Sequence, residues 1–424
     1  MAASPRSTSK QKASAADPVR PWPAGALARV PGFRTAALHC GLKRKPGNPD
    51  LALLVCDRPA AAAGVFTKNL YCAAPVTYCK AALAKSHGRA RAVVVNAGNA
   101  NACTGTQGER DAARMGSLAA KGLRCKPHEV LVCSTGVIGH VLPMQKVESG
   151  LAALAKQIAR NEPGADFARA IMTTDLVPKT AAVEVDLGFA TVKIAGATKG
   201  SGMIAPNMAT TLGFIATDAK ITPAVLQQAL SGVIDETFNC LTVDGDTSTN
   251  DTVLALASGE ASHAPLAKAS GASYRAFRAG LFAVCDDLAR QIAADGEGAE
   301  HTITVYVGGT RTDAEARQIA ATIANSPLVK TAIAGKDPNW GRIMAAAGRA
   351  GVPFDPEAGA LTVCGFDLFK DGKPTAFDAA AVSKALAARD VGIAVLVGDG
   401  PGRARYYTCD FTHGYITINA DYHT

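Results

Sequence analysis

Near its midpoint the chain carries KGSGMIAPNMATTLGF, residues 199–214. Within this stretch, Thr210 follows the small residue Ala209. A threonine hydroxyl is a weak nucleophile unless a base lies beside it, and cutting the peptide bond before Thr210 would free an α-amine that can act as that base. Pro206 and the glycines favour unusual backbone dihedrals that could strain the bond. Spacing alone also allows a glycine-rich loop that leads into a strand over residues 211–216.

Length and composition describe a large chain with moderate charge. Its 424 residues predict two or three domains, and its 48% hydrophobic residues suffice for buried cores. No apolar run approaches the roughly 20 residues that cross a bilayer. The net charge of +8 is dispersed, which argues against a nucleic-acid binder. The 11 cysteines show no CxxC pair and no zinc spacing, so we expect a reducing compartment and no metal.

Residues 1–25 are expected to form a flexible tail. The first 16 residues are rich in alanine and serine, contain Arg6, Lys10 and Lys12, and include no acid. That composition is also typical of an organelle transit peptide. Because no clear amphipathic helix is evident there, a cytoplasmic enzyme with a short tail is favoured over a protein of an organelle matrix.

Strands and helices mix along the chain without a strict β-α repeat. Hydrophobic runs predict strands, whereas helical periodicity and end signals predict two helices. The expected strands are 51–56, 91–95, 129–133, 180–186, 191–194, 211–216 and 301–307, and the expected helices run from Thr222-Pro223 to about Glu236 and across 277–292. Residues 415–424 alternate like a further strand with a short tail. This mixture predicts an α/β (α+β) fold with mixed or antiparallel sheets flanked by helices.

Ser134-Thr135-Gly136 directly follows one of these strands, and strand ends are where sites tend to lie. A threonine hydroxyl beside a glycine amide can donate two hydrogen bonds to one developing oxyanion. Taken alone, however, the tripeptide is a common turn. Its functional interpretation therefore depends on the rest of the chain.

Acidic side chains gather in DGDTSTND, residues 244–251. The segment superficially resembles a calcium-binding loop, but it lacks the turn glycine, and Ala255 stands where the final glutamate belongs. We instead expect a hydrogen-bonded polar network close to the site, formed by Asp244, Asp246, Asn250 and Asp251.

Seven motifs, in order, make the chain similar to the ornithine acetyltransferase (glutamate N-acetyltransferase) family, the acetyl-recycling enzymes of arginine biosynthesis. They are STGVIG with LPM (134–139 and 142–144), MTTD (172–175), residues 199–214, DGDTSTND (244–251), DGEGA (295–299), GKDPNWGR (335–342) and the spacing of Asn419 to Thr424. The resemblance runs from about Phe33 to Thr424. Two positions depart from it, since Thr211 stands where Met is usual and Leu176 where Thr is frequent.

The resemblance implies an α-β-β-α layered sandwich of the self-cleaving type. Cleavage would give an alpha fragment (26–209 after the tail) and a beta fragment (210–424) with a C-terminal α/β subdomain at about 305–424, assembled as an α2β2 heterotetramer. The implied reaction moves the acetyl group of N2-acetyl-L-ornithine to L-glutamate through an acetyl-Thr210 intermediate. No metal or bound cofactor is implied, although some members also take acetyl groups from acetyl-CoA to make N-acetylglutamate.

The family's roles carry over position by position. Thr210 is the expected nucleophile, preferred to Thr211 because it directly follows Ala209. Thr135 and Gly136 are the expected oxyanion hole. The residues expected to bind substrate are Thr174, Lys199, Thr210, Glu297, Asn419 and Thr424. The second threonine of MTTD is preferred to the first, and the glutamate of DGEGA would hold the δ-ammonium of ornithine or assist proton transfer.

Two other functions remain open from the sequence. One is a self-cleaving amidase or aminopeptidase on a related fold, in which water replaces the acetyl acceptor. The motifs at Thr174, Lys199, Glu297 and Asn419 argue against it. The other is an uncleaved binding or scaffold protein, which a denaturing gel distinguishes from a cleaved enzyme.

Overall fold

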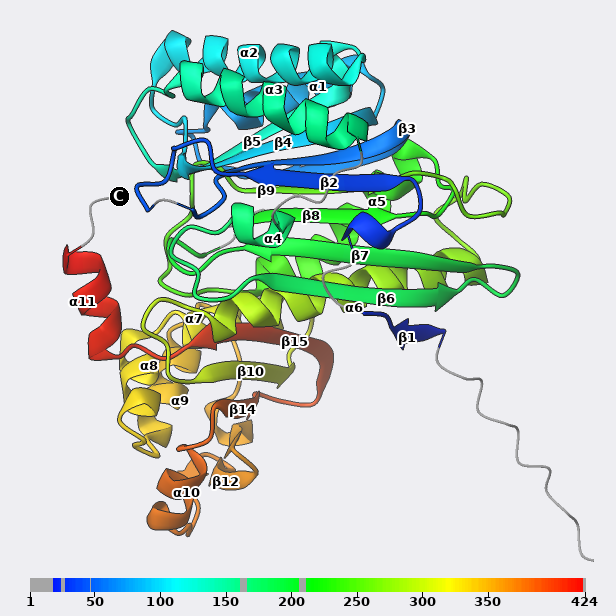
Figure 1. Ribbon diagram of the computed structural model, residues 1–424. Coiled ribbons are helices and arrows are strands. Elements are labelled where there is room, and N and C mark those ends of the chain that lie inside the picture. The colour runs from blue at the N-terminus through cyan, green and yellow to red at the C-terminus, as the bar shows by residue number, and fades with distance from the viewer. Residues whose placement is uncertain (1–17, 24–26, 46, 161–165, 206–210, 422–424) are drawn as a thin grey trace, which may run out of the picture.

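The computed structural model describes residues 18–23, 27–45, 47–160, 166–205 and 211–421. Two β-sheets organise these residues, a nine-stranded sheet in the first part of the chain and a six-stranded sheet in the last part (Figure 1). Both sheets contain parallel and antiparallel neighbours. The predicted mixed sheets are therefore confirmed.

The nine-stranded sheet has the order β1-β6-β7-β8-β9-β3-β4-β5, with β2 paired to β3. Its strands are β1 (Val19–Pro21), β2 (Phe33–Leu38), β3 (Leu51–Phe66), β4 (Arg89–Asn99), β5 (Val130–Val137), β6 (Lys179–Asp186), β7 (Thr191–Lys199), β8 (Leu212–Thr217) and β9 (Thr252–Ala257). The long strand β3 belongs to both halves of the sheet. Leu51–Val55 pairs with β2 and β4, whereas Ala61–Phe66 pairs with β9. A register shift between these two parts marks where the sheet changes direction.

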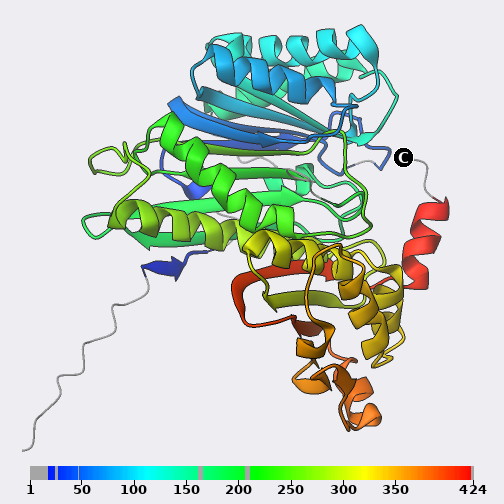
Figure 2. The ribbon, with the colours of Figure 1, turned by 180° about the vertical axis from the view of Figure 1, so that it is seen from behind.

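One half of this sheet contains β2, β4, β5 and the first part of β3, and the other contains β1, β6 to β9 and the last part of β3. The two halves pack face to face, with helices on both outer faces. In β4, Val93 and Val95 enter the core between the halves, together with Phe214 of β8, whereas Ala92 and Val94 face the outer helices. These helices are α2 (Gly105–Leu123) and α3 (Met144–Arg160), with α1 (Ala74–Lys85) beside them, and on the opposite face α5 (Pro223–Glu236) and α6 (Ala272–Ala294). Figure 2 shows α5 and α6 across that second face. The predicted α-β-β-α sandwich is confirmed.

The six-stranded sheet has the order β13-β12-β11-β14-β10-β15 and a hydrophobic core of its own. Its strands are β10 (Thr302–Gly309), β11 (Ala360–Val363), β12 (Phe366–Lys370), β13 (Lys373–Pro374), β14 (Asp390–Leu396) and β15 (Gly400–Cys409). Ile303 and Val305 of β10 pack with Ile319 and Ile323. The helices beside this sheet are α7 (Asp313–Ala324), α8 (Pro327–Ala334), α9 (Trp340–Gly348) and α10 (Ala379–Ala385). The segment around Trp340 is structural, because the indole stacks on Phe369 with 5.4 Å between ring centroids.

Local sequence signals located several elements well. Helix α5 begins at Pro223 and ends at Glu236 as predicted, although the Thr222 side chain makes no capping hydrogen bond. Helix α6 contains the predicted apolar face, and the strands predicted at 180–186 and 191–194 are β6 and β7, which pair as an antiparallel hairpin. The remaining short elements are α4 (Phe167–Ala170) and the 3-10 turns Leu27–Arg29, Pro127–Glu129, Phe238–Cys240 and Pro356–Ala358.

The strand predicted at the chain end is wrong, because residues His413–Asp421 form helix α11. The alternating Ile416 and Ile418 meet no core and are 66% and 37% exposed. Without a sheet edge or core to accept them, alternation has no packing advantage. The Thr412 hydroxyl instead accepts a hydrogen bond from the Gly414 N–H at 3.0 Å, which caps the first turn.

Candidate active site

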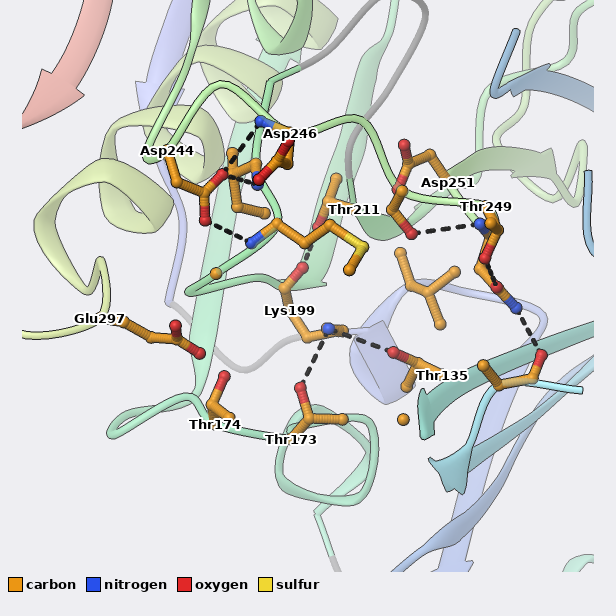
Figure 3. Close-up of a pocket in the computed structure, with 18 of the residues that line it drawn as sticks. Thr135, Thr173, Thr174, Lys199, Thr211, Asp244, Asp246, Thr249, Asp251 and Glu297 are labelled. Carbon is orange, nitrogen blue, oxygen red and sulfur yellow. Dashed lines mark hydrogen bonds between the residues drawn. The ribbon is translucent and has the colours of Figure 1, made fainter. Parts of the chain in front are cut away.

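A cavity of about 180 Å³ lies where strand ends of the first sheet meet loops and helix α11. Figure 3 shows the strand and loop residues that line it. Six of the predicted site residues line this cavity. They are Thr135, Gly136, Thr174, Lys199, Glu297 and Asn419. Thr173, the threonine that was not preferred, lines the cavity as well. The structure thus brings together residues up to 284 positions apart in the sequence. Ala209, Thr210 and Thr424, the predicted cleavage pair and terminal contact, lie outside the described residues.

The predicted oxyanion wall is built on the parallel pair β4 and β5. Gly136 pairs with Gly98 and has a φ of +127°. A side-chain carbon at Gly136 would lie 2.3 Å from the Gly98 carbonyl carbon, so only glycine fits this close approach. The Asn250 amide donates to the carbonyl of Ser134 at 2.9 Å, which fixes the strand just before Thr135. Thr135 is buried and Gly136 is half-buried.

Lys199 ends β7 and places its ammonium beside the wall. Its Nζ donates to the Thr135 hydroxyl at 3.1 Å and to the Thr173 hydroxyl at 3.0 Å (Figure 3). Burial lowers the pKa of Lys199, whereas the nearby Asp175 carboxylate opposes that shift. Thr173 therefore contacts Lys199 directly. The sequence analysis preferred Thr174, but both threonines line the cavity.

Glu297 and Asn419 form the opposite side of the cavity. The Asn419 amide donates to Glu297 Oε2 at 3.0 Å, although the two residues lie on α11 and on the loop after α6. A side-chain carbon at Gly202 would lie 2.3 Å from the same carboxylate oxygen. Gly202 therefore leaves the space that Glu297 occupies. Tyr415 of α11 also lines the cavity, and the sequence analysis did not identify it.

The four polar residues predicted to form a network, Asp244, Asp246, Asn250 and Asp251, all line the cavity, but no hydrogen bond among the described residues joins the first two to the last two. Asp244 accepts hydrogen bonds from the Met203 N–H at 2.6 Å and from the Ile204 N–H at 2.8 Å, which fixes the chain just before the segment that the structure does not describe. The Asp246 N–H also donates to Asp244, at 3.3 Å. Asp251 is 2% exposed, and burial raises the pKa of its carboxyl well above the ordinary value. Its Oδ2 has no hydrogen-bond partner among the described residues.

The hydroxyl of Thr211, the second threonine of residues 199–214, is engaged in hydrogen bonds within the protein. The Thr211 hydroxyl donates to the Lys199 carbonyl and lies 2.9 Å from the Thr198 hydroxyl. Thr211 is 4% exposed. Its hydroxyl therefore helps to join β7 to β8.

Sequence reasoning also missed the buried ion cluster behind the loop of residues 172–177, in which Lys179 lies between Asp175 and Asp295. Among the described residues, no group of three or more His, Cys, Asp or Glu side chains is placed to hold a metal ion. All 11 cysteines are free thiols. Within the same part of the chain, every helix is too short or too polar to span a bilayer.

Comparison with known proteins assigns the family. A model described as the ArgJ family matches residues 34–424. The arginine biosynthesis bifunctional protein ArgJ of Thermosynechococcus vestitus is 47% identical over 415 residues, which cover 94% of this chain and 98% of that protein. A crystal structure of the arginine biosynthesis bifunctional protein from Bacillus halodurans is 43% identical with a TM-score of 0.47, and it covers 48% of this chain and 96% of the other.

A second solved structure is that of an ornithine acetyltransferase from Mycobacterium tuberculosis complexed with ornithine. It is 39% identical with a TM-score of 0.40, and it covers 45% of this chain and 100% of the other. The family model spans nearly the whole chain, and the relative from Thermosynechococcus vestitus matches 94% of it. The chain therefore belongs to the ArgJ family.

Proposed function

We propose that this protein transfers the acetyl group of N2-acetyl-L-ornithine to L-glutamate, with Thr210 as its nucleophile after cleavage at Ala209–Thr210. One observation carries the proposal. The oxyanion pair Thr135 and Gly136 lines the same cavity as Ile204 and Thr211, which stand close to either end of the segment containing Thr210. Membership of the ArgJ family supports the same reaction.

The first step is attack of the Thr210 hydroxyl on the acetyl carbonyl, while the freed α-amine takes the hydroxyl proton. The Thr135 hydroxyl and the Gly136 N–H stabilise the oxyanion. Because the Lys199 ammonium donates to the oxygen of Thr135, that hydroxyl keeps its own proton for the oxyanion. Ornithine leaves with the proton that Thr210 gave up, and an acetyl ester remains on Thr210. The amine of glutamate then attacks this ester and restores the threonine.

The remaining residues of the cavity are proposed to bind the charged groups of the substrate. Lys199 supplies the cation for a substrate carboxylate, and Glu297 with Asn419 supplies an acceptor for the δ-ammonium of ornithine. Thr174 and Thr424 complete the proposed substrate contacts. Acetyl-CoA is a proposed second acetyl donor, and no bound cofactor or metal is part of this mechanism. We further propose an α2β2 assembly and a cytoplasmic location, with an organelle matrix as the alternative if residues 1–16 target the chain.

The deciding experiment compares Thr210→Ala with Thr211→Ala. The wild-type protein should separate on a denaturing gel into two fragments of nearly equal size, residues 1–209 and 210–424, without added protease. Thr210→Ala should stay full length and transfer no acetyl group, whereas Thr211→Ala should still be cleaved. Cleavage of Thr210→Ala at the usual rate would reject the nucleophile.

Steady-state kinetics test the covalent step separately. Double-reciprocal plots for acetylornithine at several glutamate concentrations should be parallel, and mass spectrometry should find an acetylated fragment 210–424. Converging lines without an acetylated fragment would exclude the acetyl-Thr210 intermediate. Acetate release at full rate without glutamate would instead favour the amidase alternative.

A further inference from the structure

A lysine with no solvent exposure lies directly behind the cavity. The side chain of Lys179 is 0% exposed, and its Nζ lies 2.7 Å from Asp175 Oδ1 and 2.5 Å from Asp295 Oδ2. The carbonyl of Val177 accepts a weaker hydrogen bond from the same Nζ at 3.4 Å. An isolated buried charge is very unfavourable. Removing one partner of a buried ion pair is therefore strongly destabilising, because it leaves the other charge buried and unpaired. This cluster therefore has a structural role, but its two carboxylates do not have the same surroundings.

Asp175 is connected to Lys199 at two places, through the backbone next to Lys199 and through the threonine that its ammonium contacts. Its Oδ1 accepts from the Gly200 N–H at 2.7 Å, which fixes the residue directly after Lys199. Its Oδ2 accepts from the Thr173 N–H at 2.9 Å, and the Thr173 hydroxyl in turn accepts from Lys199 Nζ. One carboxylate thus connects Lys179, the backbone beside Lys199 and a hydroxyl that Lys199 contacts.

Asp295 faces the other way. Its Oδ2 accepts from the Leu176 N–H at 3.0 Å, and its carbonyl accepts from the Ser201 hydroxyl at 2.6 Å. The Glu297 N–H donates to the Ser201 carbonyl at 3.0 Å. Asp295 thereby anchors the loop that carries Glu297, and it makes no direct contact with Lys199. It offers a matched control for Asp175.

The charge of Lys199 depends on its neighbours. Burial lowers the pKa of Lys199; Asp175 is the largest opposing influence, Lys179 lowers the pKa further, and Asp251 and Glu297 raise it. Lys43 is the other lysine that interacts with Lys199 through charge. Although burial alone would raise it, the ammonium groups of Lys179 and Lys199 lower the pKa of Asp175 to about 2. Asp175 is therefore a carboxylate throughout the neutral and alkaline range.

We propose that Asp175, held in place by Lys179, is a positioning residue that serves as the counter-ion of Lys199 and keeps its ammonium charged and aimed at a substrate carboxylate. The link to a substrate rests on the proposed acetyl transfer. The link between Asp175 and Lys199 does not, because it concerns two side chains whose titration can be measured without substrate.

The experiment compares Asp175→Asn, Asp295→Asn and Lys179→Gln in protein expressed from the complete sequence and left to process itself. Competitive labelling with acetic anhydride, normalised to a reference amine and read by peptide mass spectrometry, measures how the neutral fraction of Lys199 changes with pH. Loss of an opposite charge favours the neutral amine, so Asp175→Asn should move the Lys199 titration to lower pH by about 1 unit or more. Asp295→Asn should leave it within a few tenths of a unit of wild type.

Lys179→Gln distinguishes charge from damage, because it breaks the same buried cluster but removes a like charge. It should move the Lys199 titration to higher pH, opposite to Asp175→Asn. The alkaline limb of kcat/KM for acetylornithine should move in the same directions, with larger changes in KM than in kcat. Equal Lys199 titrations in Asp175→Asn and Asp295→Asn, or shifts of the same sign in Asp175→Asn and Lys179→Gln, would overturn the proposal. Absence of acetyl transfer in the wild type would reject the proposed function alone, since the labelling result would still decide the role of Asp175.

Discussion

The two sides of the cavity are built in different ways. Thr135 and Gly136 belong to β5, the last strand of the first sheet, which pairs with β4 and packs its buried side chains against the core and the outer helices. Asn419 and Tyr415 belong to helix α11, which contains no buried residue and stands at the edge of the molecule (Figure 1). One side is part of the core, whereas the other is a surface element attached at its base.

The attachment of α11 is local. The Thr412 hydroxyl donates to the Gly298 carbonyl at 2.6 Å, Phe411 stacks on Tyr415 with 4.8 Å between ring centroids, and Asn419 reaches Glu297. Groups that stabilise developing charge must be fixed before the reaction, because reorganisation during it would cost activation energy. Groups that only hold a substrate tolerate more freedom. The contrast therefore predicts that changes at Thr135 and Gly136, called the sheet wall below, lower kcat, whereas changes in α11 raise KM.

The largest effect is expected from Gly136→Ala. The new methyl group would meet the backbone of Gly98 at 2.3 Å, so the peptide that supplies one proposed oxyanion donor must move. We expect acetyl transfer to fall by at least about 10³-fold, as for loss of an oxyanion-hole donor, together with a lower Tm. Gly139→Ala is the matched control, because Gly139 also has a positive φ, +84°, but nothing within 4 Å of the added carbon. Equal losses in the two variants would show that backbone strain alone explains the result.

Thr135→Ala should have the next largest effect. It removes one proposed donor without disturbing the strand, so kcat should fall by about 10²–10³-fold while KM changes much less. Thr135→Ser keeps the hydroxyl and should retain most of the activity. Initial rates at saturating and limiting acetylornithine separate the two parameters. If Thr135→Ala changed only KM, Thr135 would be a substrate-binding residue and the sheet wall would lose its special role.

Asn419→Ala should have the smallest effect of the three. Loss of its hydrogen bond to Glu297 should raise KM about 10-fold, equivalent to about 1.4 kcal/mol, with little change in kcat. Deleting residues 422–424 should lower kcat/KM by a similar or larger factor and leave self-cleavage intact. Ile416→Ser is the control on α11, because this side chain is 66% exposed and its replacement should change neither parameter. A kcat defect in Asn419→Ala that matched that of Thr135→Ala would remove the distinction between the two sides.

Elements with complete local signals could be predicted from the sequence. Helix α5 has proline at its first position, and α6 has a continuous apolar face, so each was located correctly. The length of β3 could not be predicted, because Asp57, Arg58 and Pro59 interrupt its apolar pattern and only pairing with β9 extends the strand beyond them. Helix α11 was missed because alternation predicts a strand only where a sheet or core receives it.

At the site, too, the sequence could not predict features that depend on tertiary packing. Residues inside sequence motifs were found at the cavity, because a motif names them whatever the fold does. Lys179 was not, since a lysine in a sequence is normally solvated and only the packing of β6 against α6 removes this one from water. Asp295 opens the DGEGA motif, but its ion pair with Lys179 depends on the same packing. The spacing of Lys179 four residues after Asp175 is a weak signal, because the two do not lie on a common helix. The roles of Thr210 and Thr424 stay predictions.

The neighbourhood of β7 and β8 bears on how a two-piece enzyme could ever form. A cut between residues 209 and 210 falls between these adjacent strands, and two ladders cross it, β7 with β8 and β3 with β9. The pieces would share one sheet and could not separate without exposing bare strand edges, which invite aggregation. While the chain is continuous, each ladder closes as an intramolecular event at an effective concentration of about millimolar or higher. The intact precursor thus acts as its own assembly template, so we expect separately expressed fragments to reconstitute poorly even though the nicked protein holds together.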